Sequence, residues 1–186
     1  VYTIGDYAFL GCTSLREIHF GVNLQSIGKG AFSQTNFTRL NFDKNTNLNI
    51  GIGAFQQINS LIEVVYPPQS VQTLNELAFA DCNNLQRITL GAGLTSIGAN
   101  VFSNTALEEL VVPDSVTEFE WSSVQGIPTL KRLTIGDGVQ GGIPDAALSC
   151  DNGNQEALES VELGAGISGI GNAAFQLCKN LKNITL

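Results

Sequence analysis

The chain has 186 residues, of which 43% are hydrophobic and 14% charged, and 17 acidic against 9 basic residues give a formal net charge of −8. This composition is typical of an ordered protein with a continuous core and excludes intrinsic disorder as the main state. No apolar run reaches the length of a membrane span. The acidic balance, without a lysine or arginine cluster, argues against nucleic acid and anionic membrane surfaces as partners.

A short phrase built around one large apolar residue recurs along the whole chain. The recurring anchors, spaced by 22 to 27 residues, are Phe9, Phe32, Phe55, Phe79, Phe102, Val124, Leu148 and Phe175. A unit this short cannot bury its own apolar side chains, so successive copies must stack on one another. The spacing predicts one solenoid domain over residues 1–186, with about eight repeats. Because the chain has no methionine and ends on a predicted strand without a polar capping unit, we expect it to be a fragment of a longer chain.

Each anchor is followed by a six-residue segment in which apolar residues alternate. The segments are 15–20, 37–42, 61–66, 85–90, 107–112, 130–135, 158–163 and 181–186. Alternation with many β-branched residues predicts strands that show one face to a core and pair in parallel from unit to unit. Turns are predicted at Pro67, at Pro113 and at the glycine-rich segments 91–93, 136–138 and 164–166.

The return segment of each unit carries the motif Ile-Gly-x-x-Ala-Phe, as at residues 4–9. It is too short for a full helix. We expect it to form the opposite wall, as a short strand that leads into a single helical or 3₁₀ turn.

Three segments carry a family resemblance: residues 4–12, 94–102 and 107–116. They resemble the BspA-like leucine-rich repeats of bacterial and some protozoan surface proteins. The resemblance covers essentially the whole chain, with departures at Glu120-Trp121, Val124 and Leu148. It implies a β-rich α/β repeat solenoid: a curved, right-handed leucine-rich-repeat superhelix with a parallel sheet on the concave face and short strands or 3₁₀ turns on the return side. It also implies extracellular attachment or binding of host proteins.

The four cysteines lie at or next to one repeat position, two or three residues after an anchor: Cys12, Cys82, Cys150 and Cys178. Other units place Thr or Ile there, which predicts small buried side chains and therefore free thiols. A bridge between Cys150 and Cys178, in adjacent coils, is the alternative.

Metal and cofactor motifs are incomplete. There is no Cys-x-x-Cys spacing, and the one histidine, His19, is far from the cysteines in coil order. Residues 43–54 begin like a calcium loop but lack its glycine and its final glutamate, and the polar loop 151–154 lacks the spacing. The glycine pattern of residues 164–169 precedes another repeat rather than a long helix, which indicates a turn. We expect no metal and no cofactor.

The outward strand positions form two rows. The first alternates in charge: Glu17, Arg39, Glu63, Arg87, Glu109 and Arg132. The second is mixed: His19, Asn41, Val65, Thr89, Val111, Thr134, Glu162 and Thr185. Opposite charges on paired strands contribute roughly 0.2–1 kcal/mol per pair, so the first row can serve to fix register and solubility. As a functional alternative, the two rows together form a surface that suits a protein ligand.

Together with the family resemblance, which implies secretion or display on a bacterial cell surface, these features favour a non-catalytic adhesion or protein-interaction module. The expected partner is an extracellular host or matrix protein, with a glycan as a further candidate, and the expected state is a monomer. A structural spacer that displays another domain is one alternative. A carbohydrate-binding accessory module is the other, with Phe119 and Trp121 as its candidate patch. An enzyme is not expected, because nothing pairs His19 with a nucleophile.

Overall fold

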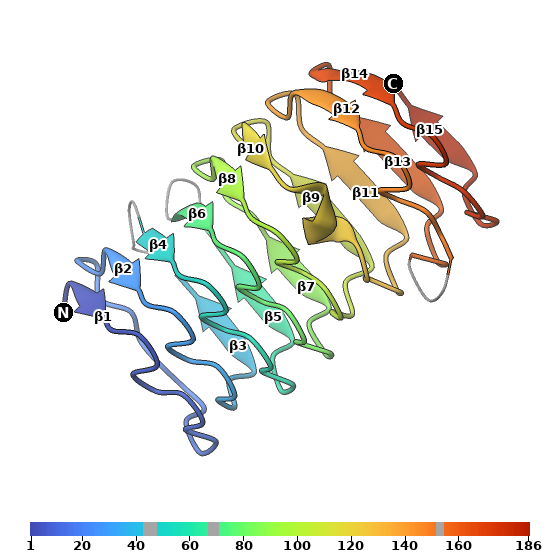
Figure 1. Cartoon of the computed structure of the whole chain (residues 1–186). Helices are drawn as coiled ribbons and strands as arrows, with labels where there is room; N and C mark the ends of the chain where they lie inside the picture. The colour runs from blue at the N-terminus through green and yellow to red at the C-terminus, as the bar shows by residue number, and fades with distance from the viewer. Residues whose placement is uncertain (43–47, 67–70, 152–154) are drawn as a thin grey trace.

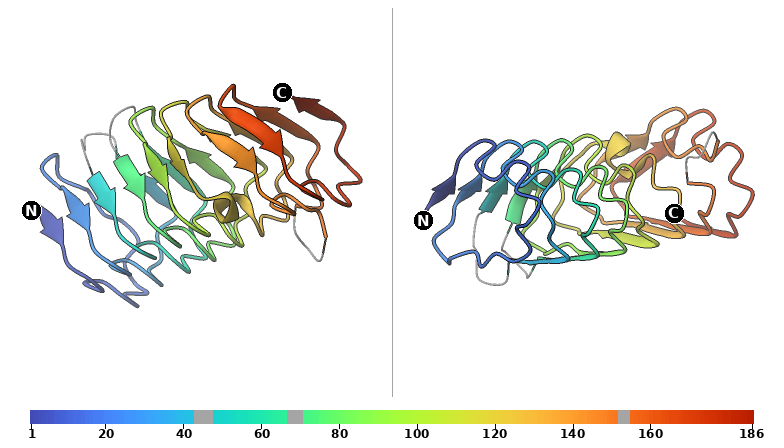
Figure 2. Two further views of the ribbon diagram at one scale, coloured as in Figure 1. Left: turned by 45° about the horizontal axis from the view of Figure 1, so that its top comes forward. Right: turned by 90° about the horizontal axis from the view of Figure 1, so that it is seen from below.

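The computed structural model describes residues 1–42, 48–66, 71–151 and 155–186. The chain winds into a parallel β-solenoid of about seven turns with almost no helix. Successive coils lie side by side, and the two termini lie at opposite ends of the stack (Figure 1, Figure 2). The predicted β-rich leucine-rich-repeat fold is confirmed. The expected turn at Pro67 and the first five residues of the calcium-like segment, 43–47, lie outside the described residues, as do residues 152–154 of the second polar loop.

One wall, here called the front wall, consists of parallel strands that follow each anchor. They are β3 (Arg39–Asn41), β5 (Glu63–Val65), β7 (Arg87–Thr89), β9 (Glu109–Val112), β11 (Arg132–Ile135), β13 (Ser160–Leu163) and β15 (Asn183–Thr185). All lie within predicted strand segments. In β3 and β5 the middle residues, Leu40 and Val64, face the core, while the flanking residues face out.

The first predicted strand is wrong: residues 15–20 form no strand. This segment contacts a neighbouring coil on one side only. The structure shows one backbone hydrogen bond from the next coil to it, from the Asn36 N–H to the Leu15 carbonyl at 3.0 Å. A strand needs a continuous ladder of such bonds, and this segment has none among the described residues.

The opposite wall, here called the rear wall, consists of shorter parallel strands. They are β1 (Thr3–Ile4), β2 (Ser26–Ile27), β4 (Leu48–Ile50), β6 (Val71–Leu74), β8 (Ser96–Ile97), β10 (Glu118–Phe119), β12 (Gly141–Ile143) and β14 (Ile167–Ile170). A single 3₁₀ helix, η1 (Trp121–Val124), follows β10 in the described part of the chain. The predicted short return strands are therefore present, whereas a helical turn accompanies only one of the strands described.

Backbone hydrogen bonds between coils explain why the other return segments are not helical. The N–H of Phe9 donates to the Ala31 carbonyl (2.7 Å), and the N–H of Phe32 donates in the same way to Ala54 (2.8 Å). Each return turn also contains left-handed residues, such as Gln34 and Gln57, both with φ of 60°. A helix would direct these N–H groups along its own axis, so bonding to the next coil excludes it.

The core is organised by two aromatic stacks. Phe9, Phe32, Phe55 and Phe79 stack with ring centroids 5.0, 5.4 and 5.5 Å apart and with nearly parallel planes. A second stack joins Phe20, Phe42 and Tyr66 at 4.8 Å per step. Rings of the two stacks meet edge to face, the geometry that their quadrupoles favour. The repeated anchor thus aligns each coil with the next.

The expectation of four buried free thiols is corrected. Cys150 and Cys178 are joined by a disulfide, with Cα atoms 4.7 Å apart, as the alternative had it. Cys82 is a buried free thiol, but Cys12 is an exposed one. Cys12 occupies the same repeat position as Cys82. It is exposed because the first coil is covered on one side only.

Candidate functional site

The outward side chains of the front wall, here called the strand face, include every residue of the two predicted rows that lies in a described strand. The registers pair Arg39 with Glu63 and Glu63 with Arg87, and in the second half Glu109 with Arg132. Ion pairs follow this register: Glu63 binds Arg39 and also Arg87 (3.3 Å), while Glu109 binds Arg132 at 2.9 Å. The predicted opposite-charge contacts are confirmed at these three steps.

The alternation does not form one continuous ladder, which corrects the prediction. Glu17 lies on the segment that is not a strand, and no ion pair joins it to Arg39 in the described chain. Likewise, none joins Arg87 to Glu109 there, because β7 and β9 belong to different sheets. The two residues are 22 positions apart, whereas Arg39, Glu63 and Arg87 are each 24 apart. The shorter coil coincides with the break in the front wall.

A further charged row was missed by reasoning from the sequence. It lies one position earlier, where the chain enters each strand: Glu108, Lys131, Glu159 and Lys182. Lys131 Nζ lies 3.0 Å from Glu108, and Lys182 Nζ lies 2.9 Å from Glu159. Applying the anchor spacing to every position of the unit, rather than to the alternating positions alone, would have found it.

The two charged rows have electrostatic consequences. The hydrogen bond from Lys182, then the charge of Lys131, holds the pKa of Glu159 below its usual range. Glu109, as hydrogen-bond acceptor and charge, raises the pKa of Arg132. Each of these two shifts favours the charged form, so the neighbouring opposite charges stabilise Glu159 and Arg132 as ions.

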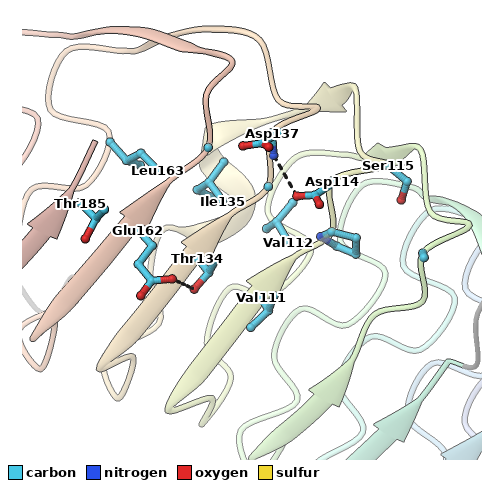
Figure 3. A pocket seen from close by; sticks show the side chains of 14 residues that line it. Val111, Val112, Asp114, Ser115, Thr134, Ile135, Asp137, Glu162, Leu163 and Thr185 are labelled. Carbon is cyan, nitrogen blue, oxygen red and sulfur yellow. Dashed lines mark hydrogen bonds between the residues drawn. The ribbon is translucent and has the colours of Figure 1, made fainter.

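The second outward row ends in a hollow. Val111, Thr134, Glu162 and Thr185 are registered neighbours on β9, β11, β13 and β15, and Figure 3 shows them on adjacent strands. Together with the turns that follow the strands they line a pocket of about 510 Å³. Val111 is 50% exposed, so the hollow offers apolar as well as polar surface.

Aspartates in the turns after the strands form the rim of this pocket. Asp114 Oδ1 accepts a hydrogen bond from the N–H of Asp137 (3.0 Å), and Asp137 Oδ1 accepts one from the N–H of Ala165 (2.8 Å). Each carboxylate thus bridges to the next coil. Glycine is required directly before Asp137, because a Cβ on Gly136 would lie 2.5 Å from the backbone nitrogen of Asp114.

The candidate secondary patch lies partly against the core. Phe119, in β10, and Trp121, which begins η1, meet edge to face with ring centroids 5.1 Å apart. Both are half-buried and pack against the core. Glycan binding at this patch stays a prediction.

His19 is exposed, on the segment that precedes the first strand of the front wall. Within the described ranges, no group of three or more His, Cys, Asp or Glu side chains is placed to hold a metal ion. No helix in that part of the chain is long and apolar enough to cross a bilayer.

The repeats identify the family. The BspA type leucine rich repeat region matches residues 1–69 and 152–186, in six copies. The match covers more than half of the chain, which therefore belongs to this family. No curated protein sequence matches significantly.

Solved structures share the fold. A leucine-rich repeat protein from Bacteroides ovatus is 21% identical, with a TM-score of 0.59 over 97% of this chain and 57% of its own. A leucine rich cell surface protein from Faecalibacterium prausnitzii is 22% identical, with a TM-score of 0.63 over 100% of this chain and 58% of its own. The pneumococcal vaccine antigen PcpA is 20% identical, with a TM-score of 0.63 over 100% and 48%. The chain thus spans about half the length of these proteins.

Proposed function

We propose that this chain is a non-catalytic interaction module of a bacterial surface or secreted protein, which binds an extracellular protein through its strand face. The observation that carries the proposal is the strand face itself: outward side chains of parallel strands, held in fixed register by hydrogen bonds and ion pairs over successive coils. Such an array presents a preorganised surface, which lowers the entropic cost of binding.

The composition of the strand face supports a protein partner. Its first row is charged but largely self-neutralised by Glu63 and by the pair of Glu109 and Arg132. The second row mixes exposed Val111 with hydroxyl and carboxylate side chains. Apolar positions among polar ones are the usual make-up of a protein interface. Deep concave sites of the kind that enzymes use are not needed for this role.

An extracellular location is supported by the disulfide between Cys150 and Cys178. Disulfides persist in oxidising compartments and are rare in the reducing cytosol. Two of the structural relatives, whose names describe a cell surface protein and a vaccine antigen, point the same way.

The test is binding of the purified chain to arrays of extracellular matrix proteins and of glycans, compared with Arg87→Glu, Trp121→Ala and a rear-wall control, Gln72→Glu. Arg87 is 60% exposed on the strand face, whereas Gln72 lies in β6 of the rear wall. Circular dichroism must first show that each variant is folded.

Saturable protein binding that is lost in Arg87→Glu and retained in Gln72→Glu is the expected result. Glycan binding lost only in Trp121→Ala would instead assign the activity to the secondary patch. If the chain bound to neither the protein array nor the glycan array, the proposal would be contradicted, and a spacer that displays another domain would be favoured.

A further inference from the structure

One carboxylate of the strand face is left out of the ion-pair rows. Glu162 lies on β13, and its registered neighbours in the second row are Thr134 and Thr185. The Thr134 hydroxyl donates to its Oε2 at 3.5 Å, as Figure 3 shows. Three bases at or next to the strands of this half are already paired: Lys131 with Glu108, Arg132 with Glu109, and Lys182 with Glu159. In the described ranges, no lysine or arginine forms an ion pair with Glu162.

Glu162 lines the hollow of about 510 Å³ that the second row shares with the turns. The rim carboxylates Asp114 and Asp137 each use Oδ1 for a backbone N–H of the next coil, and neither forms an ion pair within the described chain. The apolar part of the lining comes from Val111 and Pro113. The hollow therefore combines a negative potential with an apolar wall, on a sheet face that no other part of the described chain covers.

The lining of this hollow favours a cationic side chain over a metal ion. Within the described residues these carboxylates do not gather into a set that could hold a metal ion. A cation with a long apolar stem fits better, because it can place the stem on Val111 and its charge at Glu162. A guanidinium adds a planar set of donors, which suits a carboxylate that shares its surroundings with the Thr134 hydroxyl.

We propose that this hollow receives an arginine side chain from an extended segment of the protein partner. The guanidinium binds Glu162, and the aliphatic stem packs on Val111 and Pro113. The proposal rests on the proposed function, because it names the chemistry that one part of the strand face recognises. It also identifies the end of the second row as one place on that face where the partner is held.

The experiment is an NMR titration of the ¹⁵N-labelled chain with two capped tripeptides, Ser-Arg-Val and the same sequence with citrulline in place of arginine. Citrulline keeps the size and shape of the side chain but removes its charge. Binding of the arginine peptide should shift the amide signals of Thr134, Glu162 and Asp137. The citrulline peptide should not, and added salt should weaken the arginine binding.

Two variants of equal charge change complete the test. In Glu162→Gln the affinity for the arginine peptide should fall by about tenfold, the equivalent of one charge-assisted hydrogen bond. In Glu118→Gln, on β10 of the rear wall, it should not change. The amide spectra of the unliganded variants show whether each one is folded.

The proposal is overturned if the arginine peptide does not bind at millimolar concentration, if citrulline binds equally well, or if Glu162→Gln binds as the parent does. Such a result leaves the wider proposal intact when Arg87→Glu still abolishes binding on the protein array. If Arg87→Glu and Glu162→Gln both kept their binding on the protein array, the proposed function and the arginine site would both be contradicted.

Discussion

At the scale of single residues, Glu63 is the centre of the first charged row. It binds an arginine on each side, Arg39 and Arg87, from the two adjacent strands. Its side chain is 20% exposed, against 67% and 60% for the arginines. It is therefore the least screened member of the three, and its charge influences the register of β3, β5 and β7 together.

Glu63→Gln should lower the free energy of unfolding by about 1 kcal/mol, because two partly exposed pairs contribute roughly 0.2–1 kcal/mol each. Glu76→Gln is a matched control, since Glu76 is exposed and forms no ion pair in the described chain. Urea unfolding at low salt measures the difference, which should shrink as sodium chloride screens the pairs. Equal stability of the two variants would show that the row contributes nothing to folding.

Cys82 is a second residue whose surroundings set its chemistry. It is fully buried, and its thiol donates to the carbonyl of Phe55 at 3.2 Å. Burial, opposed by a backbone hydrogen bond and assisted by the charge of Asp81, raises the pKa of the Cys82 thiol to about 12. In the unfolded chain an ordinary cysteine ionises near pH 8.5.

The folded state therefore keeps a proton that the unfolded state loses as the pH rises. The stability that this provides is complete below about pH 8.5 and is lost as the pH approaches about 12, with a slope of up to about 1.4 kcal/mol per pH unit. In a Cys12→Ser background, Cys82→Val should flatten this alkaline decline in urea unfolding. A parallel decline in the two proteins would contradict the assigned pKa.

At the scale of elements, the repeat spacing predicted where the front-wall strands lie because one strand per coil is all that a unit of this length can hold. It could not predict the fate of residues 15–20. The same alternation becomes a strand only if a neighbouring ladder exists, and that depends on contacts made by other coils. The predicted helical turn is present only as η1 in the described chain, for a similar reason. Local propensity carries no information about hydrogen bonds between coils.

The disulfide between Cys150 and Cys178 joins two adjacent coils and closes a loop with a sequence separation of 28. The Cys178 position repeats that of Cys12 and Cys82, while Cys150 lies one residue closer to its anchor. The sequence left this pair as an alternative, because bridging depends on how two coils stack. The bond joins the return turn between β12 and β13 to the return turn between β14 and β15, next to the irregular loop that interrupts the repeat.

Cys150→Ser with Cys178→Ser should lower the free energy of unfolding by about 3 to 4 kcal/mol, the chain-entropy value for a loop of this length. Hydrogen exchange should show that the loss of protection is concentrated in β13 and β15. As a control, a reducing agent should have the same effect on the parent protein and none on the double variant. Protection that is unchanged in both strands would mean that stacking alone holds this end of the solenoid.

At the scale of the whole molecule, the two walls are interrupted at different places. The front wall divides between β7 and β9, and the rear wall divides between β10 and β12. Since the breaks are staggered, an intact sheet on one side spans each interruption on the other. The stack shown in Figure 2 therefore remains continuous.

The candidate site was predictable in part for the same physical reason as the fold. The alternation from Arg39 to Arg87 anticipated real contacts, because strand partners inherit the repeat spacing. The hollow at Glu162 was not predictable as a pocket, since it also needs the turns around Asp114 and Asp137. Their positions depend on glycines whose close backbone contacts become visible only in three dimensions.

The central claim is that the outward pattern of the strand face recognises a protein. It is tested most directly by exchanging the charges of one registered pair, Glu109→Arg with Arg132→Glu, and repeating the protein array. The exchange keeps an ion pair between β9 and β11, so thermal unfolding should be unchanged. The account predicts that binding is lost while stability is kept. Undiminished binding by the folded double variant would contradict it.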